Sequence, residues 1–120
     1  DKLIMKLKTI NPFTNKEIHT YLLHSNKRID SIIEDVYKSY NDWKNTSFRD
    51  RKRLLVEIAL HLKQNSFEYA KIITKEMGKP ISESLSEINK CSLVCDYYAE
   101  NGEAFLKSKY IKNNVKKLNK

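Results

Sequence analysis

The sequence predicts a mainly α-helical chain in which an N-terminal β-hairpin precedes four helices. Two patterns support this prediction. Apolar and polar residues alternate over residues 6–22, as in paired strands, and apolar residues then recur at helical spacing from residue 29 to about residue 106. The length of 120 residues is that of one domain.

The hairpin is expected from two alternating runs, Lys6–Ile10 and Glu17–Leu22, on either side of turn residues at Asn11–Asn15. Asn15 is the residue expected to adopt a positive φ, because its short polar side chain tolerates that conformation. A lone hairpin is marginally stable in water, so this one should pack on another part of the molecule.

A first helix is expected to begin after Ser25, which is placed to cap its N-terminus, and to end before Asn45–Thr46. Its apolar residues repeat at helical spacing for four turns and so define one apolar face. These residues are Ile29, Ile32, Ile33, Val36, Tyr37, Tyr40 and Trp43.

A second helix should begin after Ser47, with Asp50 at its third position as a variant of the capping box. The helix is expected to end near Gln64–Asn65. Four basic residues lie in its first turns, which is unfavourable for the helix dipole and suggests a salt-bridge or subunit-contact role. They are Arg49, Arg51, Lys52 and Arg53, and the expected buried face is Leu54, Leu55, Ile58, Ala59 and Leu62.

A third helix is expected over about Phe67–Met77, where Gly78 and then Pro80 supply the usual end of a helix. A fourth helix is expected from about Ile81 to Leu106. The apolar stripe of the third helix is Phe67, Ala70, Ile73 and Met77, and that of the fourth is Ile81, Leu85, Ile88, Ser92, Cys95 and Ala99. The domain therefore spans residues 1–106, and residues 107–120 are expected to be a disordered tail rich in Lys and Asn.

The net charge of +8 is concentrated in that tail, which holds six lysines and no acid. Arginine, the usual reader of bases and phosphates, occurs at four positions against 19 lysines. A solvated surface therefore explains the charge better than nucleic-acid binding. The chain also has no apolar run of the roughly 18 residues that a membrane span needs, and a cytoplasmic location is expected.

Nothing in the sequence forms a catalytic, cofactor-binding or metal-binding constellation, so none of these sites is predicted. The two glycines lie too far apart for a phosphate-binding loop. Cys91 and Cys95 are expected to be reduced packing residues, because their spacing on a helix does not suit a disulfide. The remaining candidates are interpreted as packing or surface residues: Glu83, Glu87, Asp96, Glu100, Glu103, Tyr97, Tyr98, His19, His24 and His61.

Several motifs, in order along the chain, resemble the N-terminal segment of the aldehyde dehydrogenase superfamily. The first is Lys8–Pro12 followed by Glu17–Ile18, with Asn15 at a position where the family usually has Gly. Trp43 and Ser47–Arg51 follow at matching positions. The most specific motif is Ile73–Pro80, which resembles the family's T-x-E-x-GKP landmark. Residues Lys90–Cys95 and Tyr97–Glu103 resemble the succinate-semialdehyde dehydrogenase group.

This resemblance covers about residues 5–107 and implies the outer helical part of an α/β cofactor-binding domain. The family oxidises aldehydes with NAD or NADP, but its nucleophilic cysteine, glutamate base and oxyanion-hole asparagine match no residue of this chain, and neither Cys91 nor Cys95 aligns with the nucleophile. Some relatives hold a monovalent cation near the acid that corresponds to Glu87; that site is not expected here. The departure from the family near Lys109 suggests a fragment, split gene or frameshift, and Asp1–Ile4 are expected to be extraneous.

The leading hypothesis is therefore an N-terminal fragment of a succinate-semialdehyde-type dehydrogenase that binds no cofactor and is inactive alone. Its expected partner is the rest of the dehydrogenase, or a second copy held through exposed apolar helix faces. The alternative hypothesis is a free-standing helical interaction module. A basic nucleic-acid binder is a third interpretation, and it predicts affinity that falls steeply with salt.

Overall fold

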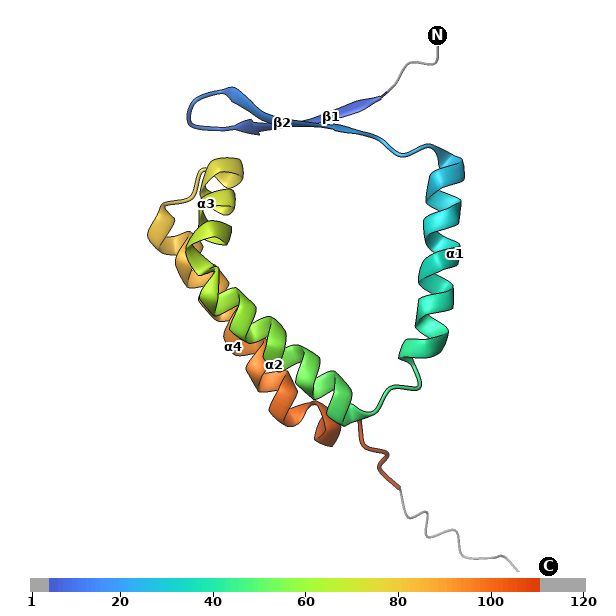
Figure 1. Ribbon diagram of the computed structural model, residues 1–120. Helices are drawn as coiled ribbons and strands as arrows, with labels where there is room; N and C mark the ends of the chain where they lie inside the picture. Colours follow the sequence, from blue (N-terminus) through green and yellow to red (C-terminus); the bar gives the residue numbers. More distant parts are fainter. Residues whose placement is uncertain (1–4, 111–120) are drawn as a thin grey trace, which may run out of the picture.

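The computed structural model describes residues 5–110 and has the predicted order of elements, a two-stranded hairpin followed by four helices (Figure 1). The helices begin and end within about two residues of the predicted positions. The elements are β1 (Lys6–Asn11), β2 (Lys16–Leu22), α1 (Asn26–Trp43), α2 (Phe48–Gln64), α3 (Ser66–Met77) and α4 (Ile81–Leu106).

The hairpin forms around the predicted turn. Its strands are antiparallel, with an irregularity between Thr9 and Ile10. Asn15 has a φ of 55°, as expected, and its amide donates to the Asn11 carbonyl at 2.8 Å. The Asn11 side chain accepts from the amides of Phe13 and Thr14 at 2.9 and 3.2 Å. The turn is thus held by local contacts of one asparagine, as its residue types suggest.

The helix ends also follow the sequence signals. Ser25 caps α1 by accepting from the Arg28 amide at 3.3 Å. Ser47 caps α2 by accepting from the Asp50 amide at 3.1 Å. Gly78 ends α3 in the left-handed conformation with a φ of 72°. Each of these residue types marks a helix terminus because the residue itself makes the capping hydrogen bond or adopts the conformation that ends the helix.

The core lies where α4 packs along α2 and α3, and it is made of small side chains. Within it, the buried Ser92 hydroxyl donates to the Ala59 carbonyl at 3.1 Å, joining α4 to α2. Thr74 and Ser84 share a hydrogen bond of 2.9 Å that joins α3 to α4. Small residues let the helix backbones approach closely. The buried side chains are Ala59, Ala70, Ser84, Ile88, Ser92 and Ala99.

The predicted buried faces are only partly covered, which corrects the sequence analysis. On α2, Leu55 and Leu62 are half-buried and Ala59 is fully buried, but Leu54 and Ile58 are exposed. Phe67 and Met77 of α3 are likewise exposed. Each of these helices has a wide apolar face, and the part of the chain that the structure describes supplies a neighbour for only one edge of it.

The apolar face of α1, here called the α1 stripe, departs most from the expectation of a packed helix. It comprises Ile29, Ile32, Ile33, Val36, Tyr37, Tyr40 and Trp43. No residue of α1 is buried. Ile33, Val36 and Tyr37 are each more than 60% exposed. Tertiary packing supplies most of the stability of helices in proteins, and α1 has almost none. Its apolar face is therefore unpartnered within the described residues.

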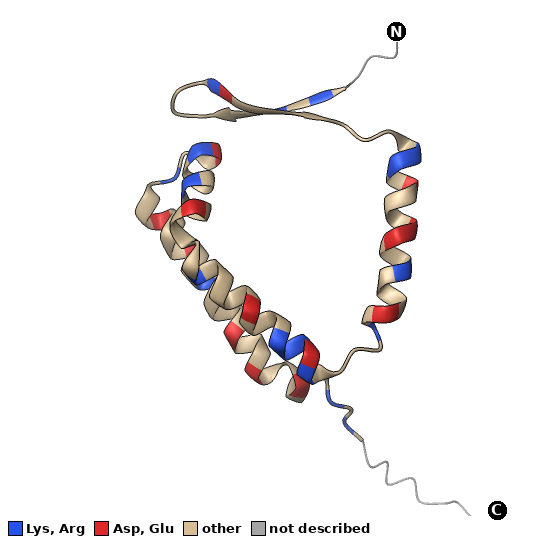
Figure 2. Cartoon of the chain, viewed as in Figure 1, with Lys and Arg blue, Asp and Glu red and all other residues tan. Residues whose placement is uncertain are grey.

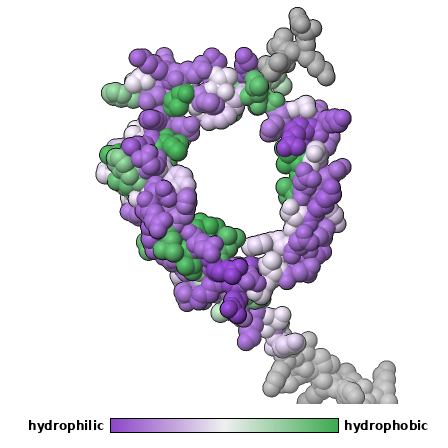
Figure 3. Space-filling model, viewed as in Figure 1, coloured by the Kyte–Doolittle hydropathy of each residue, from purple (hydrophilic) through white to green (hydrophobic). Residues whose placement is uncertain are grey.

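The elements form an open ring. In Figure 1 the hairpin, α1 and the α2–α4 pair border a central space, and in Figure 3 side chains do not fill it. The radius of gyration is 22.5 Å, whereas a compact chain of this length has roughly 14 Å. Within residues 5–110, no helix combines the length and the apolar character that crossing a membrane requires.

Helix α4 ends at Leu106, where the sequence predicts the end of this helix, and Lys107–Tyr110 follow without helix or strand. The rest of the segment predicted as a disordered tail, residues 111–120, lies outside the described residues. The same is true of residues 1–4, which the sequence analysis treats as extraneous.

Candidate functional site

Three of the five acids of α4 named above, Glu87, Asp96 and Glu100, pair with a lysine of another segment. Asp96 pairs with Lys63 at 2.8 Å, and Glu100 pairs with Lys52 at 2.9 Å. Both lysines lie on α2, so these pairs run between the two helices. Such exposed pairs contribute at most about 1 kcal/mol each. The arrangement fits a solvated, ion-paired helix surface, as the sequence analysis interprets it.

Glu87 occupies a different setting, at the junction of α4 with the loop that follows α3. Its carboxylate accepts a hydrogen bond from the Lys79 ammonium group, and this bond raises the pKa of Lys79. The acid that the family resemblance links to a monovalent cation is thus already neutralised by a side chain. Residues 5–110 also contain no cluster of three His, Cys, Asp or Glu residues that could hold a metal ion.

One buried polar atom lies at the hairpin. The Thr9 hydroxyl on β1 is buried and finds no hydrogen-bond partner among the described residues. The sequence does not indicate this atom, because burial of a strand residue on one face depends on what packs over it. Strand β1 packs on α3, which accounts for the cover.

The two cysteines differ in environment. Cys95 is half-buried on the side of α4 that carries Ile88, Ser92 and Ala99, in agreement with a packing role. Cys91 is exposed, so the expectation of packing is wrong for this residue. It lies one position before Ser92 and therefore points away from the α2–α4 contact. Both thiols are free.

The histidines and tyrosines make local contacts. The His61 ring nitrogen Nε2 and the Tyr69 hydroxyl lie 2.8 Å apart, joining α2 to α3. His19 meets Tyr21 edge to face on β2, and Tyr97 meets Tyr98 in the same way on α4. None of these contacts brings a histidine to a cysteine. They agree with the packing or surface roles expected from the sequence.

A small cleft lies between the start of α2 and the end of α4. Its apolar walls include Phe48, Leu55 and Leu106, and its volume is about 260 Å³. Pockets for drug-sized ligands run from about 300 to 1,000 Å³. A dinucleotide is larger than a typical drug, so this cleft is too small to enclose one.

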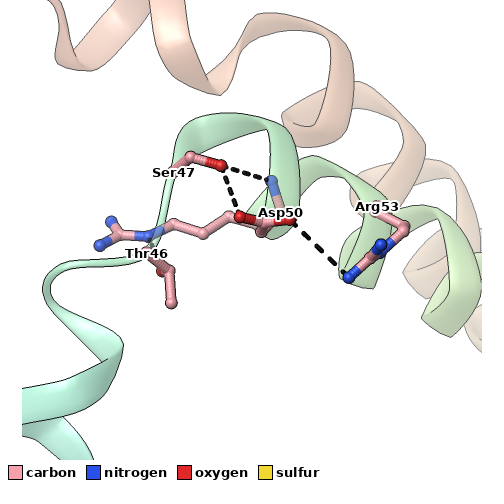
Figure 4. A network of polar contacts seen from close by, with 5 residues as sticks. Thr46, Ser47, Asp50 and Arg53 are labelled. Atoms are coloured by element: carbon pink, nitrogen blue, oxygen red, sulfur yellow. Dashed lines mark hydrogen bonds and ion pairs between the residues drawn. The ribbon is translucent and has the colours of Figure 1, made fainter.

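The corner between α1 and α2 holds a network of polar contacts. Figure 4 shows Ser47 donating to the Asp50 carboxylate at 2.6 Å while Asp50 faces Arg53 at 3.7 Å. The hydrogen bond from Ser47 lowers the pKa of Asp50. Arg51 reaches back to the end of α1, donating to the Thr46 hydroxyl at 2.9 Å and to the carbonyls of Trp43 and Lys44 at 3.1 Å.

Charge gives no indication of a nucleic-acid interface over the described residues. Lys and Arg are interspersed with Asp and Glu along the helices (Figure 2). Apolar side chains are exposed on both α1 and α2. They include most of the α1 stripe and, on α2, Leu54 and Ile58, which the core leaves uncovered.

Comparison with known proteins finds a matching family profile and several relatives. A profile described as the aldehyde dehydrogenase family matches residues 2–119, and so continues past Lys109, where the sequence analysis expects the resemblance to stop. A probable NADP+ succinate-semialdehyde dehydrogenase of Synechocystis is 33% identical over 85% of this chain and 22% of its own length. An NAD(P)+ succinate semialdehyde dehydrogenase of Escherichia coli is 34% identical over 83% of this chain and 22% of its own length.

Solved structures give the same result. The crystal structure of succinic semialdehyde dehydrogenase from Streptococcus pyogenes, in complex with NADP+ as the cofactor, superimposes with a TM-score of 0.84 at 30% identity. The match covers 89% of this chain and 24% of that one. The chain therefore spans less than a quarter of the length of the relatives it matches.

Proposed function

Because the chain belongs to the aldehyde dehydrogenase family, we propose that it forms one part of an NAD(P)-dependent dehydrogenase that oxidises succinate semialdehyde to the carboxylate. The substrate is suggested by the relatives, which are succinate-semialdehyde dehydrogenases of three different bacteria. A cytoplasmic location is part of the same proposal, because both cysteines are free and reduced thiols suit that compartment.

We further propose that residues 1–120 alone do not turn over an aldehyde. Hydride transfer from a thiohemiacetal needs a thiolate, an oxyanion hole and a bound nicotinamide at one place. Cys91 and Cys95 both lie in the middle of α4, away from the helix N-terminus that would activate a thiol.

The observation that supports this proposal most directly is the open ring. Its radius of gyration of 22.5 Å and its uncovered α1 stripe indicate that a further body of protein normally completes the fold. We assign that role to the rest of the dehydrogenase, as a continuation of the chain or as a separate polypeptide. In this assignment the chain contributes a structural layer, and the catalytic groups come from the part that it covers.

The proposal is tested by assaying the purified 120-residue chain with succinate semialdehyde and NAD or NADP, following the reduced nicotinamide by its absorbance. No turnover is expected. A separately produced polypeptide that corresponds to the remainder of a related dehydrogenase should regain activity when the chain is added. Turnover by the chain alone would overturn the proposed division of roles.

A hydrodynamic measurement separates this function from the alternative, a free-standing interaction module. Size-exclusion chromatography with light scattering should show the chain forming a complex with the remainder of the dehydrogenase. A stable assembly of the chain with itself that excludes the remainder would instead favour the module.

A further inference from the structure

The direction of α1 relative to the rest of the molecule depends on very few contacts. No α1 side chain is buried, and the helix forms one side of the ring (Figure 1). Among the described residues, the hydrogen bonds that join α2 to the end of α1 and its linker, Trp43–Thr46, all come from the Arg51 guanidinium. Arg51 is therefore the side chain that connects the two helices.

A positive charge at the C-terminal end of α1 is electrostatically favourable, and Arg51 provides it. The last carbonyl groups of a helix lack partners within it and carry the negative end of its dipole. The last turn of α1 contains no basic residue of its own. Arg51 supplies the missing positive charge from the next helix, by donating to the carbonyls of Trp43 and Lys44.

Aromatic contacts add to the hydrogen bonds. The Arg51 guanidinium lies 5.6 Å from the ring centre of Trp43 and 5.9 Å from that of Phe48. Trp43 is the last residue of α1 and Phe48 is the first of α2, so the cation contacts a ring on each helix. A planar, five-donor guanidinium can meet all these partners together, which a lysine cannot do.

We propose that Arg51 is a positioning residue that clasps the end of α1 and fixes the direction in which the α1 stripe faces its docking partner. This inference rests on the proposed function, in which that partner is the rest of the dehydrogenase. It also explains why a basic residue is placed near the unfavourable N-terminus of α2. The C-terminal end of α1, where a positive charge is favourable, lies within reach of Arg51.

Nitroxide labels on the 120-residue chain test the clasp directly. One label is attached at Lys38→Cys on α1 and the other at Cys91 on α4, with Cys95→Ser to avoid a third site; Lys38 and Cys91 are both exposed. Pulsed electron resonance should give one narrow distance distribution with Arg51 present. Arg51→Gln should broaden it markedly, while far-UV circular dichroism stays close to that of the parent chain.

Arg53→Gln is the matched control, because Arg53 is in the same helix turn and makes only an exposed pair with Asp50 at 3.7 Å. It should leave the distribution narrow. Arg51→Lys keeps the positive charge but lacks the planar, five-donor guanidinium, so it should also broaden the distribution. A narrow distribution in both Arg51 variants would overturn the clasp, and so would equal broadening by Arg53→Gln.

A second measurement uses Trp43, the single tryptophan of the chain. Loss of the Arg51 contact should increase quenching of its fluorescence by acrylamide, and Arg53→Gln should not. Binding to the remainder of the dehydrogenase is measured separately. Arg51→Gln should weaken that binding, whereas failure of the parent chain to bind would contradict the proposed function and leave the distance result intact.

Discussion

Gly78 leaves room for Pro12: a Cβ atom on residue 78 would lie 2.9 Å from Cγ of Pro12. The contact brings the tip of the hairpin against the end of α3, at the left-handed residue that closes that helix. Two requirements therefore coincide at one position, a positive φ and the absence of a side chain. The hairpin can pack on α3 because both are met.

We predict that Gly78→Ala lowers the free energy of unfolding by at least about 1 kcal/mol. The left-handed conformation alone costs an L-residue roughly 1–2 kcal/mol, and the contact with Pro12 adds to that cost. Urea denaturation followed by circular dichroism measures the change. Gly102→Ala is the control: it lies within α4 with nothing near its Cβ, and it should be neutral or stabilise by up to about 1 kcal/mol.

The contact between α2 and α4 leaves no space at Ser92. The residue is 1% exposed, and its hydroxyl donates to Ala59 across the interface. Ser92→Leu should overpack this site and lower the unfolding free energy by about 1–3 kcal/mol. Ser86→Leu makes the same change at an exposed position of α4 and should stay within about 0.5 kcal/mol of the parent. Equal losses in the two variants would show that the interface is not closely packed at Ser92.

The N-cap of α2 predicts a dependence on pH. The hydrogen bond from Ser47 holds the pKa of Asp50 below its unfolded value, about 3.9. The resulting stabilisation is complete above that value, and it is lost as the pH falls through the lowered pKa. Asp50→Asn should therefore reduce the loss of unfolding free energy between about pH 5 and about pH 2.

Ser47→Ala provides the cross-check for this assignment, because it removes the donor and keeps the carboxylate. It should flatten the same part of the pH profile, and the double variant should flatten it no further than the stronger single one. A Ser47→Ala profile with the parent's slope would assign the pH dependence to other acids, such as Glu17. The pKa of Glu17 is lowered first by its hydrogen bond from Lys8.

The features that the sequence predicted correctly are local ones. Ser25, Ser47 and Gly78 act within four residues of their own positions, so their types suffice to place the helix ends. The positive φ of Asn15 follows in the same way from the turn residues around it. Periodicity correctly predicted which residues share a helix face.

The features that were missed depend on distant neighbours. Periodicity cannot tell whether an apolar face is covered, so Leu54 and Ile58 were expected to be buried and are exposed. Ser84 was not singled out, although it is fully buried against Thr74. Arg51 looked unfavourable at the start of its own helix, because its partners belong to the preceding one. In each case, the determining contact lies on another element.

The exposure of the α1 stripe gives the last prediction. Ile33 is 61% exposed on α1, whereas Ile88 is 8% exposed in the contact of α4 with its neighbours. Ile88→Ala removes buried surface and should cost the isolated chain about 2–5 kcal/mol of unfolding free energy. Ile33→Ala removes little, and Ala is the better helix former, so the change should stay within about 0.5 kcal/mol.

The effect of Ile33→Ala should change when the remainder of the dehydrogenase is present. If that part covers the α1 stripe, Ile33→Ala acquires the cost of a buried truncation and weakens the complex, although it leaves the isolated chain unchanged. Lys38→Ala on the opposite face of α1 is the control and should affect neither measurement, because Lys38 makes only an exposed contact with Asp35. An Ile33→Ala chain that binds the remainder as tightly as the parent would place the docking surface elsewhere than on α1.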